Sequence, residues 1–344
     1  MVGIGKGAEN NILIKDAESL EELHKVGAVV LDKTGTITEG KPEVTGIYWS
    51  EGVSAGIYMP VLLELESQSE HPLAGAVVAY LTEMGITAGR DGSFESITGQ
   101  GVHGHIAGKD YYIGNRRLLE AQGIVVSGEL QEWVQELQLA GNTVVHFADE
   151  NKVLAVIGIA DRIKPTSAEA VSRLKKMGVE VYMLTGDNTV TARAVADQAG
   201  IANYQAEVMP SDKADFVKSL QQQGIKVAMV GDGINDSQAL AQADVSMAMG
   251  RGSDIAIDVA KLTLITSDLN VIPKAIALSR QTTHAIRQNL FWAFIYNLIG
   301  IPLAAGVLYP CCGFLLNPMI AAAAMAFSSV SVVSNSLRIK AKKI

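Results

Sequence analysis

Three acidic, glycine-containing turns each follow a short apolar run in this chain. The runs are residues 28–31, 179–184 and 225–230, and the turns after them read Asp32-Lys33-Thr34-Gly35-Thr36, Thr185-Gly186-Asp187 and Gly231-Asp232-Gly233-Ile234-Asn235-Asp236. Short apolar runs bounded by turn residues are typical of buried strands. The carboxyl ends of parallel strands form the crevice where open α/β sheets bind ligands. We therefore expect the three turns to meet at one edge of a sheet.

The first turn has the residues for covalent phosphate chemistry. Aspartate is a nucleophile that can form an aspartyl-phosphate, and Asp32 stands at the end of its predicted strand. Gly35 allows the backbone to approach a phosphate closely, and exposed N–H groups in such a turn can hold its oxygens. A bare Asp-Lys-Thr-Gly is more commonly only a strand followed by an Asx turn.

The other turns have the groups that would support such a reaction. Carboxylates of Asp32, Asp232 and Asp236 suit Mg²⁺, which prefers oxygen ligands and offsets repulsion between carboxylates and phosphate. Thr185 can hydrogen-bond a phosphoryl group, and Lys213 can supply positive charge. Each residue alone is more commonly a solvated turn residue. Their order, all at strand ends or helix starts, favours phosphoryl transfer, which depends on positioning and electrostatics.

The elements around these turns alternate between strand and helix. Helices are predicted at residues 165–177, 190–199 and 211–223, between the apolar strands. This alternation indicates an α/β fold with a doubly wound parallel sheet. Short strands and helices with glycine turns interrupt it and predict an inserted α+β domain. We expect a stalk and the first part of the sheet domain in 1–41, the inserted domain in 42–155 and the second part in 156–270.

The composition excludes some function classes. The 344 residues carry a net charge of −8, so there is no basic field for nucleic acid. The only cysteines, Cys311 and Cys312, are adjacent, which predicts no disulfide framework and fits a reducing cytosol. The first residues lack the apolar core of a signal peptide.

The apolar excess lies near the C-terminus. No charged residue occurs between positions 289 and 337. About 20 apolar residues suffice to cross a bilayer, so we expect a stalk helix at 271–288 and a transmembrane hairpin of helices at about 289–310 and 316–337. Basic residues flank the hairpin, including the tail 338–344, which places both ends in the cytosol by the positive-inside rule.

The order of the motifs resembles the signature series of P-type ATPases, within the haloacid dehalogenase-like superfamily. The resemblance rests on the three turns named above and on Lys213. It implies that Asp32 is the phosphoryl acceptor. It also implies that Asp232, the Thr34 main chain and Asp236 surround Mg²⁺, that Thr185 and Lys213 contact the phosphate, and that Gly186, Asp187 and Asn235 belong to the site.

The inserted block resembles the heavy-metal (type IB) subclass. Its Ser69-Glu70-His71-Pro72-Leu73 is similar to the Ser-Glu-His-Pro motif of those pumps. The resemblance implies an ATP pocket lined by Glu66, His71, Gly99, Gly101 and Asn115. Gly99-Gln100-Gly101-Val102-His103-Gly104 is a poor dinucleotide fingerprint and is better interpreted as a strand turn. His103 stands where some relatives have a small residue and is assigned no role.

The predicted hairpin resembles the Cu(I)/Ag(I)-exporting branch. Polar residues in a spanning helix are functional candidates, and a thioether is a soft ligand suited to Cu(I). The candidate Cu(I) path is Tyr296, Asn297, Met325 and Ser329. Relatives that transport zinc or cadmium are expected to place charged residues in these helices, and none occurs here. Cys311 and Cys312 either contact exiting copper or are ordinary residues at the membrane edge.

The resemblance predicts ATP-driven copper(I) export across a membrane, the inner membrane of a bacterium, with the soluble domains in the cytoplasm. It covers about the C-terminal half of such a pump, because Cys-Pro-Cys and Thr-Gly-Glu motifs are absent. We expect that transport needs the missing N-terminal half, with its actuator domain and earlier helices. One alternative is a membrane-tethered phosphatase, although Thr34 replaces that class's general-acid aspartate. The other is a non-enzymatic, ATP-binding regulatory partner of another pump.

Overall fold

The computed structural model describes residues 2–89, 92–126, 128–250, 252–313 and 317–341. Residue 316 of the second predicted span and residues 342–344 of the predicted basic tail lie outside this part. The chain divides into two compact units. The first unit comprises Met1–Val30, Ser172–Glu180 and Lys213–Ile344, and the second comprises Leu31–Val171 and Val181–Asp212. Each is described by itself.

The first unit contains the core of a parallel sheet. Strand β11 (Val227–Gly231) pairs in parallel with β12 (Val245–Met249), β12 pairs in parallel with β13 (Leu262–Leu264), and β13 pairs antiparallel with β1 (Ile12–Ile14). Every residue of β11 and β12 is buried, as expected for a sheet covered on both faces. The short helices α10 (Ser237–Gln242) and α11 (Asp254–Val259) connect these strands.

Strand β2 (Ala28–Asp32) begins between two of its neighbours. The N–H groups of Gly27 and Ala28 donate to the Lys226 carbonyl at 2.9 and 3.2 Å, and Glu180 N–H donates to the Gly27 carbonyl at 2.9 Å. The full order of the sheet is β1-β13-β12-β11-β2-β9-β10, with β9 at Glu180–Leu184 and β10 at Asn203–Gln205. The predicted doubly wound α/β sheet is confirmed.

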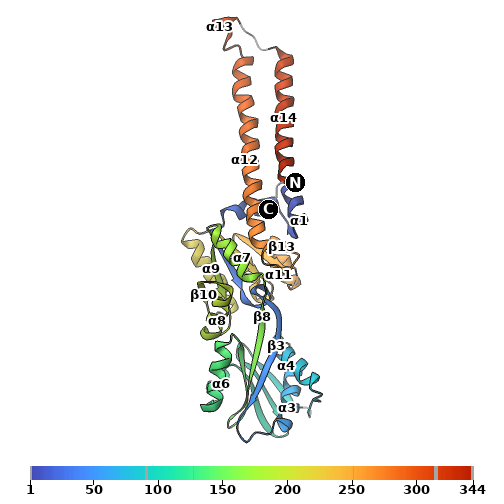
Figure 1. The fold of residues 1–344 in the computed structure, drawn as a ribbon, viewed down its shortest axis with the longest axis vertical. Coiled ribbons are helices and arrows are strands. Elements are labelled where there is room, and N and C mark those ends of the chain that lie inside the picture. The colour runs from blue at the N-terminus through green and yellow to red at the C-terminus, as the bar shows by residue number, and fades with distance from the viewer. Residues whose placement is uncertain (1, 90–91, 127, 251, 314–316, 342–344) are drawn as a thin grey trace. The chain divides into compact units, whose positions relative to one another are not determined.

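The second unit contains a six-stranded antiparallel sheet. Its order is β3 (Thr38–Trp49), β8 (Val153–Ile163), β7 (Thr143–Asp149), β6 (Lys109–Gly114), β5 (Gly101–Ile106) and β4 (Ser93–Ile97). Helices α3 (Ala55–Ser67) and α4 (Pro72–Glu83) pack on one face, where Leu62, Val77 and Phe147 share a core. Helices α5 (Arg116–Ala121) and α6 (Gly128–Leu139) pack on the other face, on Val144 and Val156. Helices thus cover both faces (Figure 1).

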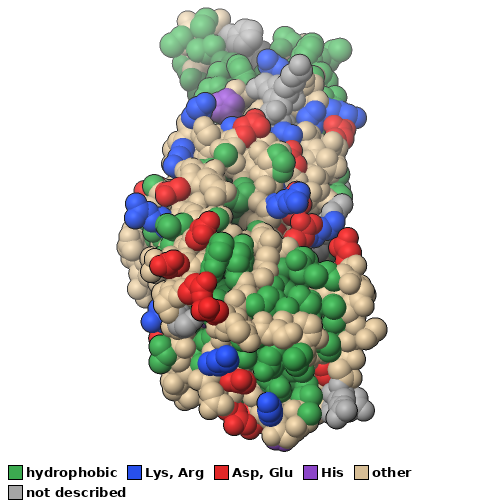
Figure 2. Space-filling view, turned by 60° about the horizontal axis from the view of Figure 1, so that its bottom comes forward, with side chains coloured by type: hydrophobic (Ala, Val, Ile, Leu, Met, Phe, Trp, Pro, Cys, Tyr) green, Lys and Arg blue, Asp and Glu red, His purple; other side chains and the backbone are tan. Residues whose placement is uncertain are grey.

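Alternation along β7 explains how one strand serves two cores. Val145 and Phe147 point into the core under α3 and α4, whereas Val144 and Ala148 point into the core under α5 and α6. Successive side chains of a strand face opposite sides of a sheet. On the face drawn in Figure 2, acidic and basic side chains are interspersed.

The last part of the first unit is a helical hairpin. Helix α12 (Val271–Ala304) lies beside α14 (Pro318–Ala341), with the short α13 (Tyr309–Cys312) after α12 (Figure 1). Asn289 links the long helices: its Nδ2 donates to Ser336 Oγ at 2.9 Å, and its Oδ1 accepts from Asn335 Nδ2 at 2.9 Å.

The hairpin differs from the prediction in two ways. The predicted stalk (271–288) and first span (289–310) are one continuous helix, which ends at Ala304, before the predicted end. Within the described part of the chain, no helix has both the length and the apolar character that crossing a membrane requires. The predicted transmembrane character of the two helices is therefore not confirmed.

Candidate active site

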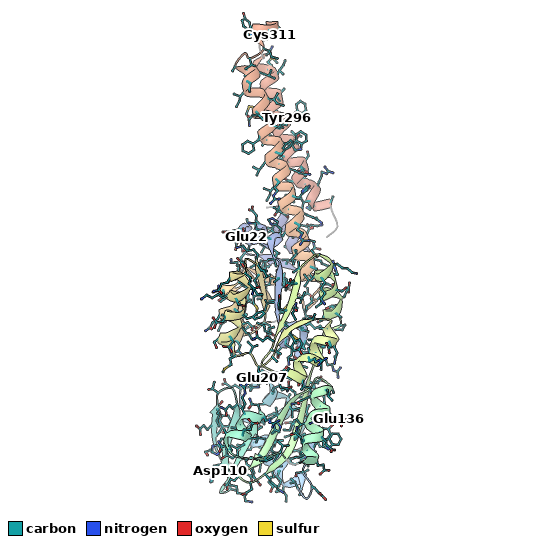
Figure 3. All side chains as sticks on the ribbon, turned by 90° about the vertical axis from the view of Figure 1, so that its left-hand side faces the viewer. Glu22, Asp110, Glu136, Glu207, Tyr296 and Cys311 are labelled. Carbon is teal, nitrogen blue, oxygen red and sulfur yellow. The ribbon has the colours of Figure 1, made fainter. Side chains whose placement is uncertain are left out.

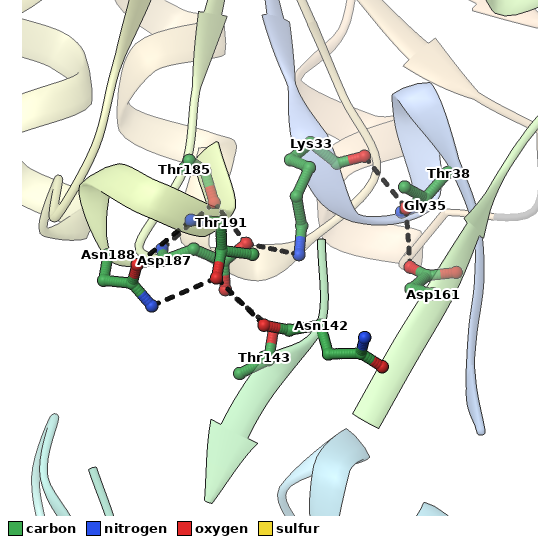
Figure 4. A network of polar contacts seen from close by, with 10 residues as sticks. All are labelled: Lys33, Gly35, Thr38, Asn142, Thr143, Asp161, Thr185, Asp187, Asn188 and Thr191. Carbon is green, nitrogen blue, oxygen red and sulfur yellow. Dashed lines mark hydrogen bonds and ion pairs between the residues drawn. The ribbon is translucent and has the colours of Figure 1, made fainter. Parts of the chain in front are cut away.

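The turn that follows Asp32 is fixed by its own hydrogen bonds. Asp32 ends a strand in which all five residues are buried, and the turn Lys33–Ile37 begins directly after it. Gly35 has a φ of 71°, which a residue with a side chain rarely adopts. The Thr38 hydroxyl accepts from Gly35 N–H at 3.2 Å and donates to Asp161 Oδ2 at 2.5 Å (Figure 4). The sequence motif therefore forms a shaped loop.

A buried lysine holds the same loop from the other side. Lys164 Nζ donates to the carbonyls of Gly35 and Thr36 at 2.6 and 2.7 Å, and Ser167 Oγ donates to the Ile37 carbonyl at 2.7 Å. These bonds occupy the loop's carbonyl groups. The sequence analysis missed both Asp161 and Lys164. One sequence signal could have indicated them. The polar residues Asp161, Arg162 and Lys164 lie between a long apolar strand and a helix.

The second predicted turn is paired with the first. Lys33 Nζ lies 2.6 Å from Asp187 Oδ2, and both side chains are only 10% exposed. Thr185 and Thr143 hydroxyls donate to the two Asp187 oxygens at 3.0 and 2.9 Å (Figure 4). Burial alone would raise the pKa of Asp187, but the charge of Lys33 and these hydrogen bonds outweigh it and lower the pKa. Asp187 is therefore ionised and pairs with Lys33. The sequence analysis did not predict this pair.

The third turn is organised around Asp236 in the first unit. Its Oδ1 lies 2.7 Å from Lys213 Nζ, and both side chains are almost fully buried. Its Oδ2 accepts from the N–H groups of Asp232 and Gly233 at 3.3 and 3.4 Å. A Cβ on Gly231 would lie 2.5 Å from Asp236 Oδ2, so this position excludes a side chain. Lys213, which was predicted to contact phosphate, is paired with Asp236 here, while Asn235 is exposed.

Two of the predicted nucleotide residues lie on helices α3 and α4. Glu66 is buried, and burial raises the pKa of its carboxyl to about 7. His71 is the N-cap of α4, where its Nδ1 accepts from Leu73 N–H at 3.2 Å. Because Nδ1 accepts this bond, Nε2 carries the ring proton and can donate elsewhere.

The structure brings the other three nucleotide candidates together. Asn115 Nδ2 donates to the Gly99 carbonyl at 2.9 Å, and its Oδ1 caps α5 by accepting from Leu118 N–H at 3.2 Å. Gly101 has a φ of 149°, and a Cβ there would lie 2.1 Å from the Ile113 carbonyl oxygen. Both glycines are therefore required by the backbone, and Asn115 fixes the turn between them.

The predicted copper residues lie on the helical hairpin. Tyr296 lies on α12 (Figure 3). It lines a cavity of about 360 Å³ between α12 and α14, with Gln288, Trp292, Ser331, Ser334, Asn335 and Arg338. Asn297 and Ser329 bond to carbonyls of their own helices, at Ala293 and Met325. The Met325 side chain is exposed. The structure therefore places Tyr296 in the cavity but does not join the four residues into one site.

Comparison with known proteins decides the family. The haloacid dehalogenase-like hydrolase family matches residues 26–244, which include all three acidic turns. The chain belongs to this family. Within the family, it is 49% identical to a copper-exporting P-type ATPase of Legionella pneumophila over 340 residues, 99% of the chain and 46% of the relative. It is 44% identical to a silver-exporting P-type ATPase of Salmonella typhimurium, over 100% of the chain and 42% of the relative.

A solved structure has the same fold. The crystal structure of a zinc-transporting PIB-type ATPase in the E2.Pi state matches with a TM-score of 0.71 and 32% identity, covering 98% of this chain and 54% of that one. The chain spans about half the length of the curated relatives it matches. These comparisons confirm the resemblance to heavy-metal P-type ATPases that the motifs predict.

Proposed function

We propose that this chain is the catalytic portion of an ATP-driven Cu(I) or Ag(I) exporter that stores a phosphoryl group on Asp32. The observation that carries the proposal is the position of Asp32 at the end of a buried strand, directly before a loop held by Lys164, Ser167 and Asp161. A nucleophile on a rigid loop has its attacking oxygen fixed before the substrate arrives.

Strand register supports a shared site for Asp32 and Asp232. Ala28 N–H bonds to the Lys226 carbonyl where β2 and β11 begin. Each strand then runs five residues, β2 to Asp32 and β11 to Gly231, just before Asp232. Parallel neighbours of equal length end at the same sheet edge. From the order of the motifs in the sequence, we propose that both aspartates face the same phosphate.

The carboxylates fit a Mg²⁺ ion by their chemistry. Asp32, Asp232 and Asp236 supply the hard oxygen donors that Mg²⁺ takes. Asp236 already accepts from Lys213 and from two backbone N–H groups, so we assign it to shaping the turn as well as to the ion. The Thr34 main chain would complete the protein's ligands. When bound, Mg²⁺ offsets the negative charge between carboxylate and phosphate.

The proposed reaction is an in-line transfer. A carboxylate oxygen of Asp32 attacks the γ-phosphorus of ATP, the bond to the β–γ bridging oxygen breaks, and ADP leaves with that electron pair. The Thr185 hydroxyl donates to Asp187 in this structure, and we propose that it turns its proton to a phosphoryl oxygen when ATP is bound. Thr34 stands two residues after Asp32 and has no acidic proton at neutral pH. This residue favours a stored phosphoenzyme over rapid hydrolysis.

ATP would bind on the six-stranded sheet of the second unit. Gly99 leaves room for the nucleotide beside a turn that Asn115 fixes, while Gly101 lets the neighbouring strand approach closely. Glu66, with a pKa near neutrality, can donate a hydrogen bond to a ring nitrogen when protonated, and His71 offers its Nε2.

The hairpin would form part of the ion path in a bacterial inner membrane. Large apolar side chains on α12 and α14, including Phe294, Leu298 and Phe327, are exposed, and no charge occurs from 289 to 337. Such surface is suited to lipid or to further helices. Tyr296, Asn297, Met325 and Ser329 would then contact Cu(I) or Ag(I), with the rest of the path supplied by the earlier helices that relatives contain.

The test is acid-stable labelling with γ-³²P-ATP. The proposal predicts that the wild-type chain takes label and that Asp32→Asn takes none. The control is Glu136→Gln, a change at an exposed residue of α6, which should take label like the wild type. Rapid phosphate release from small phosphoesters without a labelled intermediate would favour the phosphatase alternative. Nucleotide binding without any label would favour the regulatory alternative. Label retained in Asp32→Asn would contradict the proposed acceptor.

A further inference from the structure

Two histidines and an aspartate converge on one face of the six-stranded sheet, and the histidines lie on the strand β5 that also carries Gly101. His103 and His105 lie two residues apart on β5, so their side chains share a face. Asp110 on β6 is the direct cross-strand partner of His105, and Glu95 on β4 is the direct partner of His103. Three neighbouring strands thus supply imidazole and carboxylate groups to one patch.

The ligand atoms are already close. Asp110 Oδ1 lies 3.0 Å from His103 Nε2 and 2.9 Å from His105 Nδ1, so one oxygen is shared by two imidazoles. In a tetrahedral zinc site, bonds of about 2.0–2.2 Å separate neighbouring ligand atoms by roughly 3.4 Å. The three residues do not all place ligand atoms within 4.8 Å of one another, so a metal ion would draw the two imidazoles together by rotation of these partly exposed side chains.

Neighbouring groups hold the ligands in place. The His103 ring stacks on Tyr112 with centroids 4.9 Å apart and an angle of 19°. His103 Nδ1 faces Glu95 Oε2 at 3.8 Å, as metal-ligating histidines commonly present their second nitrogen to a carboxylate. Glu150 Oε1 accepts from Asp110 N–H at 3.1 Å and adds negative charge. Hydrogen bonds from His105 and His103 lower the pKa of Asp110 and keep it ionised.

We propose that His103, His105 and Asp110 bind a divalent transition-metal ion of the Zn²⁺ type, with water in the fourth position. Two imidazoles select against Mg²⁺, and a carboxylate ligand is less suited to soft Cu(I) than thiolate or thioether. The ion would join β5 to β6 and stabilise the inserted sheet. The proposal does not depend on phosphoryl transfer.

Co²⁺ binding to the full chain tests the proposal, because tetrahedral Co²⁺ gives visible d–d absorption. Two measures keep Co²⁺ from other groups. Excess Mg²⁺ occupies the carboxylates of the acidic turns, and a Cys311→Ser/Cys312→Ser background removes the thiols. We expect one equivalent of Co²⁺ in this background and in its His24→Gln variant. We expect at least tenfold weaker binding in His103→Gln/His105→Gln and in Asp110→Asn. Zn²⁺ should raise the unfolding midpoint of the parent but not of the double variant.

Two results would overturn the site. One is the absence of a visible band in the parent chain at neutral pH. The other is an unchanged band and stoichiometry in the double histidine variant, whose circular dichroism shows whether it is folded.

Discussion

The ammonium group of Lys33 lies 2.6 Å from a carboxylate oxygen of Asp187, and both side chains are largely buried. Lys33 comes directly after Asp32, and Asp187 comes at the end of the second motif. The pair therefore ties the loop that carries the proposed nucleophile to the loop that carries Thr185. It orders two motifs that lie far apart in the sequence.

Loss of this pair should destabilise the chain strongly. Lys33→Met leaves the Asp187 carboxylate buried without its cation, and breaking a buried pair in this way costs about 3–5 kcal/mol. The exposed Lys41→Met is the matched control and should change the stability by less than about 0.5 kcal/mol. Urea unfolding followed by circular dichroism measures both. Equal midpoints for the two variants would show that the pair contributes nothing.

The stability should also depend on the ionisation of Glu66. Burial raises its pKa to about 7, so the folded state favours the neutral carboxyl. The contribution of neutral Glu66 to the free energy of unfolding is fully present below the unfolded pKa of about 4.5. It is lost as the pH rises to about 7, a change of about 3 kcal/mol. Glu66→Gln removes this dependence. The difference between the urea midpoints at pH 5 and pH 8 should be smaller for the variant than for the wild type. An equal difference in both proteins would contradict the raised pKa.

Lys164 should matter for the reaction more than for nucleotide binding. Lys164→Met frees the carbonyls of Gly35 and Thr36, and a misplacement of about 1 Å near a nucleophile can cost about 10²-fold in rate. We expect the rate of phosphoenzyme formation to fall by that order while ATP affinity stays unchanged. The exposed Lys152→Met is the control. Rapid-quench labelling and equilibrium ATP binding separate the two effects, and a parallel loss of both would refute the assigned role.

Gly101 should not tolerate a side chain. Gly101→Ala would bring a Cβ to 2.1 Å from the Ile113 carbonyl at a φ of 149°. We expect a loss of at least about 2 kcal/mol and weaker ATP binding. Gly56→Ala, in open space on helix α3, should instead leave stability unchanged or raise it by up to about 1 kcal/mol. Thermal unfolding of both variants measures the contrast, and a tolerated Gly101→Ala would show that the backbone relaxes there.

The sheet and its turns could be predicted because their signals are local. The apolar runs before Asp32, Thr185 and Gly231 are short and bounded by glycine, so strand type and strand ends follow from the sequence. Gly99, Gly101 and Asn115 were named together from the resemblance, and the structure joins Asn115 to Gly99 by a hydrogen bond; their role in an ATP pocket stays a prediction. The local sequence pattern is thus enough to locate the strands that end at the three acidic turns.

The pairings between distant residues could not be predicted. Lys33 with Asp187, and Lys164 with the Gly35 loop, depend on how strands pack in three dimensions. The pair of Lys213 with Asp236 was likewise not predicted; Lys213 was predicted to contact phosphate, and that contact stays a prediction. Helix α12 is continuous through Asn289 because the start of the uncharged stretch is a change of composition only, with no glycine or proline there to end a helix.

The central claim is that a phosphoryl group is stored on Asp32, and chemical mapping tests it most directly. The full chain is incubated with ATP and Mg²⁺, quenched in acid and reduced with borohydride, which converts an aspartyl-phosphate to homoserine. Peptide mass spectrometry should find homoserine at position 32 and nowhere else. Homoserine at another aspartate, or none in a chain that binds ATP and accepts label, would contradict the account.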